Sequence, residues 1–232
     1  MKEKGLSQEG LKAIACGTML LDHIGAALVP WEILRVIGRI AFPIFCFLLA
    51  EGAARSRNPA RYAARLMLAA LLSELPFDLL FFRRVKPADQ NVMVTLLLGL
   101  VMAFCLMRTD SGWVQAAAVA GFALLADYWN TDYGGWGVVL IALFVLTRGK
   151  PQARLTQLLG MTVIFYAMNS YPLTMAGLRI PIEMFALLAM VPISLYHGKK
   201  RTQSPAVRFG FYCFYPVHLT LLLLIRLAIF GA

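Results

Sequence analysis

The sequence predicts an all-α fold, a single polytopic membrane domain over residues 1–232 with about nine transmembrane helices. The first observation is composition: 60% of the residues are hydrophobic, 15% are charged and the mean hydropathy is +0.71. Soluble domains average about 45–50% apolar and about 25% charged residues. The second observation is that the apolar residues form long blocks separated by short charged or Pro/Gly connectors. No repeat or long linker divides the chain.

The blocks give the expected spans in order: 11–29, 36–54, 62–82, 91–107, 113–128, 134–147, 155–168, 180–196 and 209–230. The first follows a basic start, as a signal peptide does, but it contains Asp22 and His23, and further spans follow at once. We therefore expect a retained first helix. A straight span needs about 20 residues. Blocks 134–147 and 155–168 are shorter, so one of them is a candidate re-entrant segment.

Charge sets the expected topology, because cytoplasmic connectors are enriched in Lys and Arg. With alternating spans, most cations fall on the side of the N-terminus: Lys2, Lys4, Lys12, Arg55, Arg57, Arg61, Arg65, Arg108, Arg148, Lys150, Arg154, Lys199, Lys200, Arg201 and Arg208. This predicts a cytoplasmic N-terminus, although Arg83, Arg84 and Lys86 oppose it locally. The cytoplasmic placement of these cations accounts for the net charge of +10, so we expect no nucleic-acid partner.

Ionisable residues inside the apolar blocks are the main functional signal. Asp22 and His23 lie in the first block, and His218 lies in the last, two residues after Pro216. Such groups cost about 3 kcal/mol at mid-membrane, so they are commonly functional. Neighbours on a helix point about 100° apart, so Asp22 cannot orient His23. We expect Asp22 to meet Arg39 and either histidine to act as a general base, with simple helix packing as the alternative.

The connector after the second block is a candidate anion site. Asn58 followed by Pro59 is typical of a helix start. A helix N-terminus attracts anions, and the flanking cations suit the phosphates of coenzyme A. The predicted cofactor-binding residues are Arg55, Arg57, Asn58, Arg61 and Arg65. The alternative is that topology alone places these cations there.

Further polar residues are candidates for binding substrate. They are Glu51, Ser73, Glu74, Asp78, Asn91, Thr95, Asp132 and Tyr133. Glu74 and Asp78 share a helix face, as do Asn91 and Thr95. They either line a cavity or join helices by hydrogen bonds, and the sequence does not separate the two. The aromatic, glycine-rich turn around Asp132 is either an acceptor mouth or an ordinary interfacial loop.

Several catalytic signatures are missing from the chain. It has no His-Glu-x-x-His, no Gly-x-Ser-x-Gly, no P-loop and no Gly-x-Gly-x-x-Gly. The four cysteines, Cys16, Cys46, Cys105 and Cys213, are scattered through apolar blocks, which favours packing roles. We therefore expect no metal site.

The motifs together resemble the TraX family of integral membrane proteins associated with pilin N-acetylation. The resemblance rests on Met19-x-x-Asp22-His23-Ile24-Gly25, Gly38-Arg39, Glu51-Gly52, Arg57-Asn58, Tyr62-x-x-Arg65, Ser73-Glu74-x-Pro76-Phe77-Asp78, Asn91-Val92-x-x-Thr95, Thr131-Asp132-Tyr133-Gly134 and Tyr215-Pro216-x-His218-Leu219. The family is more distantly similar to multi-span membrane acyltransferases.

This resemblance implies an acetyltransferase in the bacterial plasma (inner) membrane, with acetyl-CoA as donor. It leaves the acceptor open among a peptide amine, a sugar and a lipid, and the oligomeric state is also open, a homo-oligomer included. Ser73 or Asn91 would hydrogen-bond the developing oxyanion. The competing hypothesis is a proton-coupled transporter or exporter, in which the buried acids relay protons with the histidines. The acetyltransferase mechanism requires the first helix, Arg39 and His218 to converge.

Overall fold

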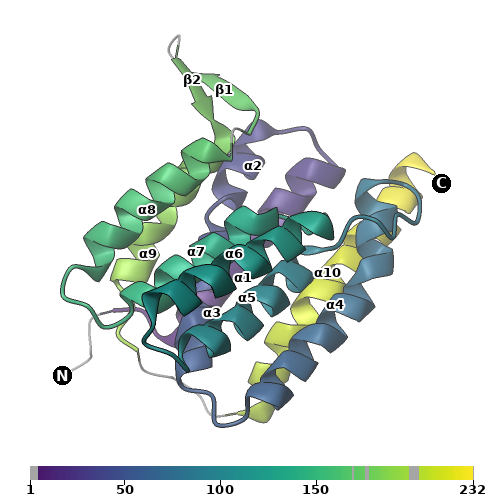
Figure 1. Cartoon of the computed structure of the whole chain (residues 1–232). Helices are drawn as coiled ribbons and strands as arrows, with labels where there is room; N and C mark the ends of the chain where they lie inside the picture. The colour runs from purple at the N-terminus through teal and green to yellow at the C-terminus, as the bar shows by residue number, and fades with distance from the viewer. Residues whose placement is uncertain (1–4, 169, 176–177, 199–203, 232) are drawn as a thin grey trace.

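The computed structural model describes residues 5–168, 170–175, 178–198 and 204–231 as a bundle of helices (Figure 1). The helices are α1 (Gln8–Ala27), α2 (Glu32–Gly38), α3 (Ala41–Ala54), α4 (Pro59–Phe81), α5 (Val92–Leu106), α6 (Gly112–Tyr128), α7 (Gly134–Thr147), α8 (Ala153–Ala167), the 3-10 helix η1 (Ile182–Ala189), α9 (Met190–Ser194) and α10 (Pro205–Phe230). Between α8 and η1, strands β1 (Pro172–Met175) and β2 (Leu178–Pro181) pair antiparallel and project from one end of the bundle.

The predicted helical fold is confirmed, with two local differences. Block 36–54 is divided into α2 and α3, because Pro43 has no N–H to bond the carbonyl four residues earlier; Arg39 and Ile40, between the two helices, keep helical backbone angles. Block 180–196 begins as β2 and continues as η1 and the short α9, which contains Pro192. A proline therefore interrupts the regular α-helix in each of these two apolar blocks.

Outward-facing apolar side chains indicate a membrane environment. Leu68, Leu71, Leu72 and Leu75 form an exposed stripe along α4. Among the described residues, Glu32–Ala54 and Phe209–Phe230 are long and apolar enough to cross a membrane, while Val92–Leu106, Gly134–Thr147 and Ile182–Ser194 are shorter apolar helices. The protein is therefore membrane-associated.

The helices bring two sets of residues to opposite ends of the bundle. At one end, the start of α1, the end of α3 and the start of α4 line a cavity. Towards the other end, the last turns of α1 and α4 meet α2 and the start of α5 around a second cavity. Of the cations expected near the first end, Lys2, Lys4, Lys199, Lys200 and Arg201 lie outside the described residues, as does the side chain of Arg208.

Candidate functional site

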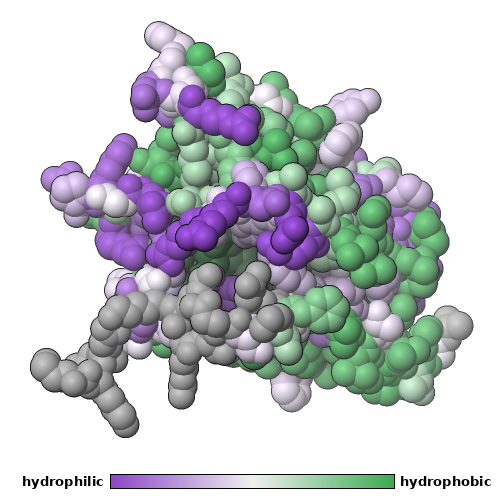
Figure 2. All heavy atoms as spheres, turned by 90° about the horizontal axis from the view of Figure 1, so that it is seen from below, coloured by the Kyte–Doolittle hydropathy of each residue, from purple (hydrophilic) through white to green (hydrophobic). Residues whose placement is uncertain are grey.

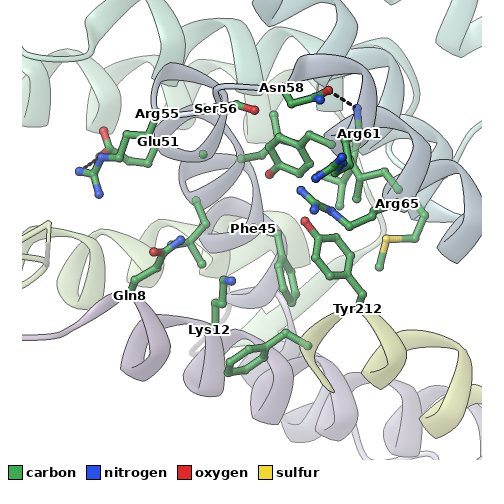
Figure 3. Close-up of a pocket in the computed structure, with 18 of the residues that line it drawn as sticks. Gln8, Lys12, Phe45, Glu51, Arg55, Ser56, Asn58, Arg61, Arg65 and Tyr212 are labelled. Atoms are coloured by element: carbon green, nitrogen blue, oxygen red, sulfur yellow. Dashed lines mark hydrogen bonds and ion pairs between the residues drawn. The ribbon is translucent and has the colours of Figure 1, made fainter. Parts of the chain in front are cut away.

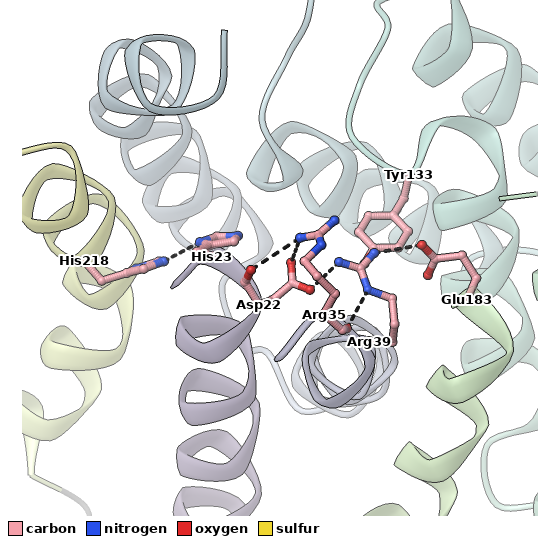
Figure 4. A network of polar contacts seen from close by, with 7 residues as sticks. All are labelled: Asp22, His23, Arg35, Arg39, Tyr133, Glu183 and His218. Atoms are coloured by element: carbon pink, nitrogen blue, oxygen red, sulfur yellow. Dashed lines mark hydrogen bonds and ion pairs between the residues drawn. The ribbon is translucent and has the colours of Figure 1, made fainter. Parts of the chain in front are cut away.

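Two histidines from the ends of the sequence meet inside the bundle. His23, near the end of α1, and His218, in the middle of α10, stack with ring centroids 4.9 Å apart. The Nδ1 atom of His23 lies 2.7 Å from the Nε2 atom of His218 (Figure 4). Phe81 and Tyr215 contact His23 edge-on. The predicted convergence of the first and last spans is confirmed.

Hydrogen bonding fixes the proton positions of the neutral pair. The Nδ1 atom of His218 is 2.8 Å from the carbonyl oxygen of Phe214, which only accepts, so Nδ1 donates. The Nε2 atom of neutral His218 is then an acceptor, and His23 donates to it from Nδ1. The remaining nitrogen of His23, Nε2, is left with a free lone pair. His218 therefore orients His23 and leaves it the better placed base.

Asp22 faces the other way and anchors a charged network. Its carboxylate accepts a 2.6 Å hydrogen bond from Arg35 and a hydrogen bond from Arg39, both on the α2 segment (Figure 4). The expected pairing of Asp22 with Arg39 is confirmed. Gly38 permits this approach, because a Cβ there would overlap the Asp22 side chain. The neighbours Asp22 and His23 thus serve two different networks, as helix geometry requires.

Arg39 is the centre of the charged network. It is buried and donates to Glu183 of η1 at 2.8 Å and to the hydroxyl of Tyr133 at 3.4 Å. Tyr133 adopts a left-handed backbone conformation with φ of 66° and stacks on Phe42 at 3.6 Å. Two arginines thus pair with the carboxylates of Asp22 and Glu183, which offsets part of the cost of burying these charges.

We call the cavity beside this network the histidine cavity. Its volume is about 230 Å³, and its walls include His23, Arg35, Arg39, Asp132 and Tyr133, but not His218. Asp132 reaches this cavity from the loop between α6 and α7. Aromatic side chains of α3 and α4 and apolar side chains of α1 and α5 line most of the remaining wall. The histidine cavity therefore combines a base, cations and an apolar lining.

The second cavity, which we call the basic cavity, has a volume of about 680 Å³. It is lined by all the residues predicted to bind the cofactor, Arg55, Arg57, Asn58, Arg61 and Arg65, and by Lys12 and Glu51. Figure 3 shows Arg61 and Arg65 pointing into the same hollow as Lys12. Asn58 caps α4 by accepting a 2.8 Å hydrogen bond from the backbone of Arg61, as the sequence predicted.

Arg65 is the clearest sign that the basic cavity accepts an anion. Its guanidinium lies between the rings of Tyr62 and Tyr212, at 5.8 and 5.4 Å. Within the described part of the chain, its buried Nε atom has no hydrogen-bond partner. An unsatisfied buried donor on a cation favours a negatively charged ligand.

The two cavities share walls. Phe45, Met93 and Leu96 line both of them. These three apolar side chains, from α3 and α5, therefore form a wall common to the basic cavity and the histidine cavity.

Five other predicted substrate residues have hydrogen-bond partners within the protein, and Asn91 is the one that links the start of α5 to α4. Asn91 accepts from the backbone of Met93 at 2.9 Å and donates to the carbonyl of Ala70 and to Glu74, and Ser73 donates to the carbonyl of Ala69. Asp78 accepts from the backbone of Lys86, and Thr95 donates to the carbonyl of Asp132. None of these five side chains (Ser73, Glu74, Asp78, Asn91, Thr95) is among the residues that line the two cavities.

Sequence reasoning missed the positions of Arg35 and Glu183. Arg35 and Arg39 are one helical turn apart, and this spacing could have indicated that both face Asp22. Glu183 lies 144 positions from Arg39, so no local pattern points to it. Within the described residues, no cluster of His, Cys, Asp and Glu is suited to hold a metal ion.

Comparison with known proteins places these residues in a family context. The family model described as "TraX protein" matches residues 7–226. The "Probable fimbrial assembly protein FimC, serogroup H1" of Dichelobacter nodosus is 31% identical over 230 residues, which cover 91% of this chain and 92% of that protein. "Protein TraX" of Escherichia coli is 28% identical over 166 residues, or 68% of this chain and 64% of that protein. No solved structure matches the chain.

Proposed function

The chain belongs to the TraX family, and on that premise we propose that it is an integral membrane acetyltransferase. The acetyl group moves from acetyl-CoA to an amine or hydroxyl acceptor at the membrane. The observation that carries this proposal is the position of His23: it lines a cavity that shares the apolar wall of Phe45, Met93 and Leu96 with a cationic cavity at the other end of the bundle. A donor bound at the cationic end reaches the base through the protein.

We place the bundle across the bacterial plasma membrane with nine crossings. The crossings are α1, α2 with α3, α4, α5, α6, α7, α8, η1 with α9, and α10. They alternate in direction, so the basic cavity faces the cytoplasm under the positive-inside rule. In this arrangement α7 and α8 both cross, and neither is re-entrant. Acetyl-CoA, a cytosolic metabolite, then enters on the correct side.

The basic cavity holds the phosphates of the donor in this proposal. Arg61 and Arg65 lie on successive turns at the start of α4, where the helix dipole also favours negative charge. Residues 12 to 23 of α1 cover the distance from the cationic cavity to the histidine, which is about 16 Å at 1.5 Å per residue. The extended thioester arm of the donor would reach His23 by passing the shared wall at Phe45.

His23 removes the acceptor proton. As the acceptor nitrogen or oxygen attacks the thioester carbonyl, its proton passes to Nε2 of His23 and a tetrahedral oxyanion forms. The carbon–sulfur bond then breaks, and the departing thiolate of coenzyme A takes the proton back from His23. The resulting products are the acetylated acceptor and free coenzyme A.

Arg35 and Arg39 stabilise the oxyanion in this scheme. Both line the histidine cavity, whereas Ser73 and Asn91, the candidates from the sequence, are not among its walls. A fixed positive charge in an apolar cavity stabilises developing negative charge strongly. Arg39 itself is held by Asp22 and Glu183, so Arg35, with one carboxylate partner, is the better placed donor.

The proposal is tested with purified protein and native membranes that supply the acceptor. Acetyl-CoA raises the melting temperature of the detergent-purified protein, because it binds the native state. Release of coenzyme A thiol, followed with a thiol reagent, requires His23 and falls to background in His23→Gln. Full activity in both His23→Ala and His218→Ala excludes the histidine mechanism.

A proton-coupled transporter is the competing function, and the charged network with its carboxylates is the feature that favours it. The two functions differ in a direct measurement. A transporter shows no stabilisation by acetyl-CoA and no thiol release, but acidifies vesicles in a substrate-dependent way. Stabilisation by acetyl-CoA that Arg61→Gln/Arg65→Gln abolishes supports the acetyltransferase.

A further inference from the structure

A third cavity, of about 380 Å³, lies beside the basic cavity at the same end of the bundle. Its walls come from the ends of α3 and α7, the α7–α8 loop, the start of α8, and residues 196–198. It contains Arg55, Arg148, Lys150 and Arg154 against one carboxylate, that of Glu51. Hydrophilic side chains gather on this side of the molecule (Figure 2). We call the third cavity the lateral cavity.

Glu51 and Arg55 form the wall between the lateral and basic cavities. The two oxygens of Glu51 bind Arg148 at 2.8 Å and Arg55 at 2.5 Å. Arg55 also donates to the carbonyl of Gly198 at 2.8 Å and to the hydroxyl of Tyr196 at 3.2 Å. Arg55 therefore has hydrogen-bond partners within the wall. The single carboxylate of Glu51 neutralises the charge of only one of its two partners, Arg55 and Arg148. An excess of positive charge remains on the lateral side.

Arg154 is exposed, but contacts in the lateral cavity hold its side chain. It donates to Gln157 at 3.0 Å and lies over the ring of Phe47 at 5.1 Å. Gln157 is buried and in turn donates to Thr147 at 2.9 Å. The positive-inside rule explains cations at this end of the bundle, but it does not require an arginine side chain to be fixed by specific contacts. Arg154 also stands in the first turn of α8, where the helix dipole favours an anion.

The surface next to the lateral cavity is apolar. Along α8, the exposed side chains Leu155, Leu159, Val163 and Tyr166 form one stripe, with Leu155 directly following Arg154. A neighbouring stripe comes from η1 and α9, where Leu188, Val191 and Leu195 are exposed. Helix α8 packs against both η1 and α9. An anionic head over the lateral cavity would therefore have its hydrocarbon chains against these stripes.

From this arrangement we infer that the lateral cavity binds the phosphate of an anionic phospholipid, with the acyl chains along α8. A free phosphate lacks the apolar part, and the donor phosphates already have Arg61 and Arg65 beyond the Glu51–Arg55 wall. The inference rests on the membrane arrangement proposed above but not on acetyl transfer. Because Glu51 and Arg55 belong to both cavities, the bound lipid also steadies the mouth of the basic cavity.

The test measures melting temperature in uncharged detergent with short-chain phosphatidylglycerol, short-chain phosphatidylcholine, inorganic phosphate or coenzyme A. We expect phosphatidylglycerol to stabilise the protein far more than phosphatidylcholine or phosphate. Lys150→Gln/Arg154→Gln weakens the apparent affinity for phosphatidylglycerol about 30-fold, since each cation near a lipid phosphate contributes about a fivefold effect. Arg83→Gln/Arg84→Gln, at the opposite end, is the matched charge control and leaves it unchanged.

Other outcomes overturn the inference. Equal effects of phosphatidylglycerol and phosphatidylcholine exclude a phosphate-specific site. Loss of the coenzyme A shift, rather than the lipid shift, in the double variant assigns the lateral cavity to the donor. If Lys150→Gln/Arg154→Gln does not fold, Lys150→Gln alone, in the exposed loop, provides the comparison, and an unchanged affinity there excludes the site. A lipid shift without any coenzyme A shift supports the lipid site while contradicting the acetyltransferase.

Discussion

The basic cavity and the histidine cavity are built in opposite ways. The arginines of the basic cavity all come from residues 55–65, and most are exposed. The histidine cavity depends on pairs such as His23 with His218, 195 positions apart, and Arg39 with Glu183. The first region is a local charge pattern in contact with water. The second is a desolvated assembly, in which each charge needs a partner from elsewhere, so the loss of one partner has larger consequences.

The largest expected effect is on the proton acceptor. His23→Ala lowers the turnover of acetyl transfer about 10²–10⁴-fold, the usual contribution of a general base. His218→Ala lowers it less, because it removes only the group that orients His23. Thiol release at saturating acetyl-CoA measures both. A greater loss in His218→Ala than in His23→Ala would reverse the assignment of base and positioning residue.

The next effect is on stability. Arg39→Ala leaves the carboxylates of Asp22 and Glu183 without their shared partner and lowers the free energy of unfolding by about 3–5 kcal/mol. Unfolding in mixed detergent micelles measures this loss. Arg57→Ala, an exposed arginine in the basic cavity, is the control with little effect on stability. Similar free energies of unfolding of the two variants would show that the histidine cavity and the basic cavity do not differ in this respect.

A smaller effect is expected on donor binding. Arg61→Gln/Arg65→Gln raises the KM for acetyl-CoA about 100-fold or more, since each of the two charge-assisted hydrogen bonds contributes about 1.5–3 kcal/mol. The turnover at saturation stays near that of the parent protein. The KM also rises with salt in the parent protein, because part of this cavity is exposed. A lowered turnover with unchanged KM would place these arginines in the chemical step instead.

The smallest effect concerns the cap of α4. Asn58→Ala removes the acceptor for the Arg61 backbone N–H and lowers the free energy of unfolding by about 1 kcal/mol. Asn58→Ser retains a capping oxygen and recovers most of the loss. The melting temperatures of the two variants give the comparison. Equal melting temperatures of the two variants would show that the capping hydrogen bond does not stabilise α4.

The sequence by itself determined the helical fold, the cap at Asn58, the cationic connector and the need for Asp22 and His23 to have separate partners. These follow from local composition, the 3.6-residue period and the cost of charge in hydrocarbon. Tertiary structure alone decided that His23 faces a cavity while His218 orients it, that Arg35 and Glu183 complete the charged network, and that Asn91 joins helices. Such pairings depend on how helices pack, because contacts between residues far apart in the chain leave no periodic trace in one sequence.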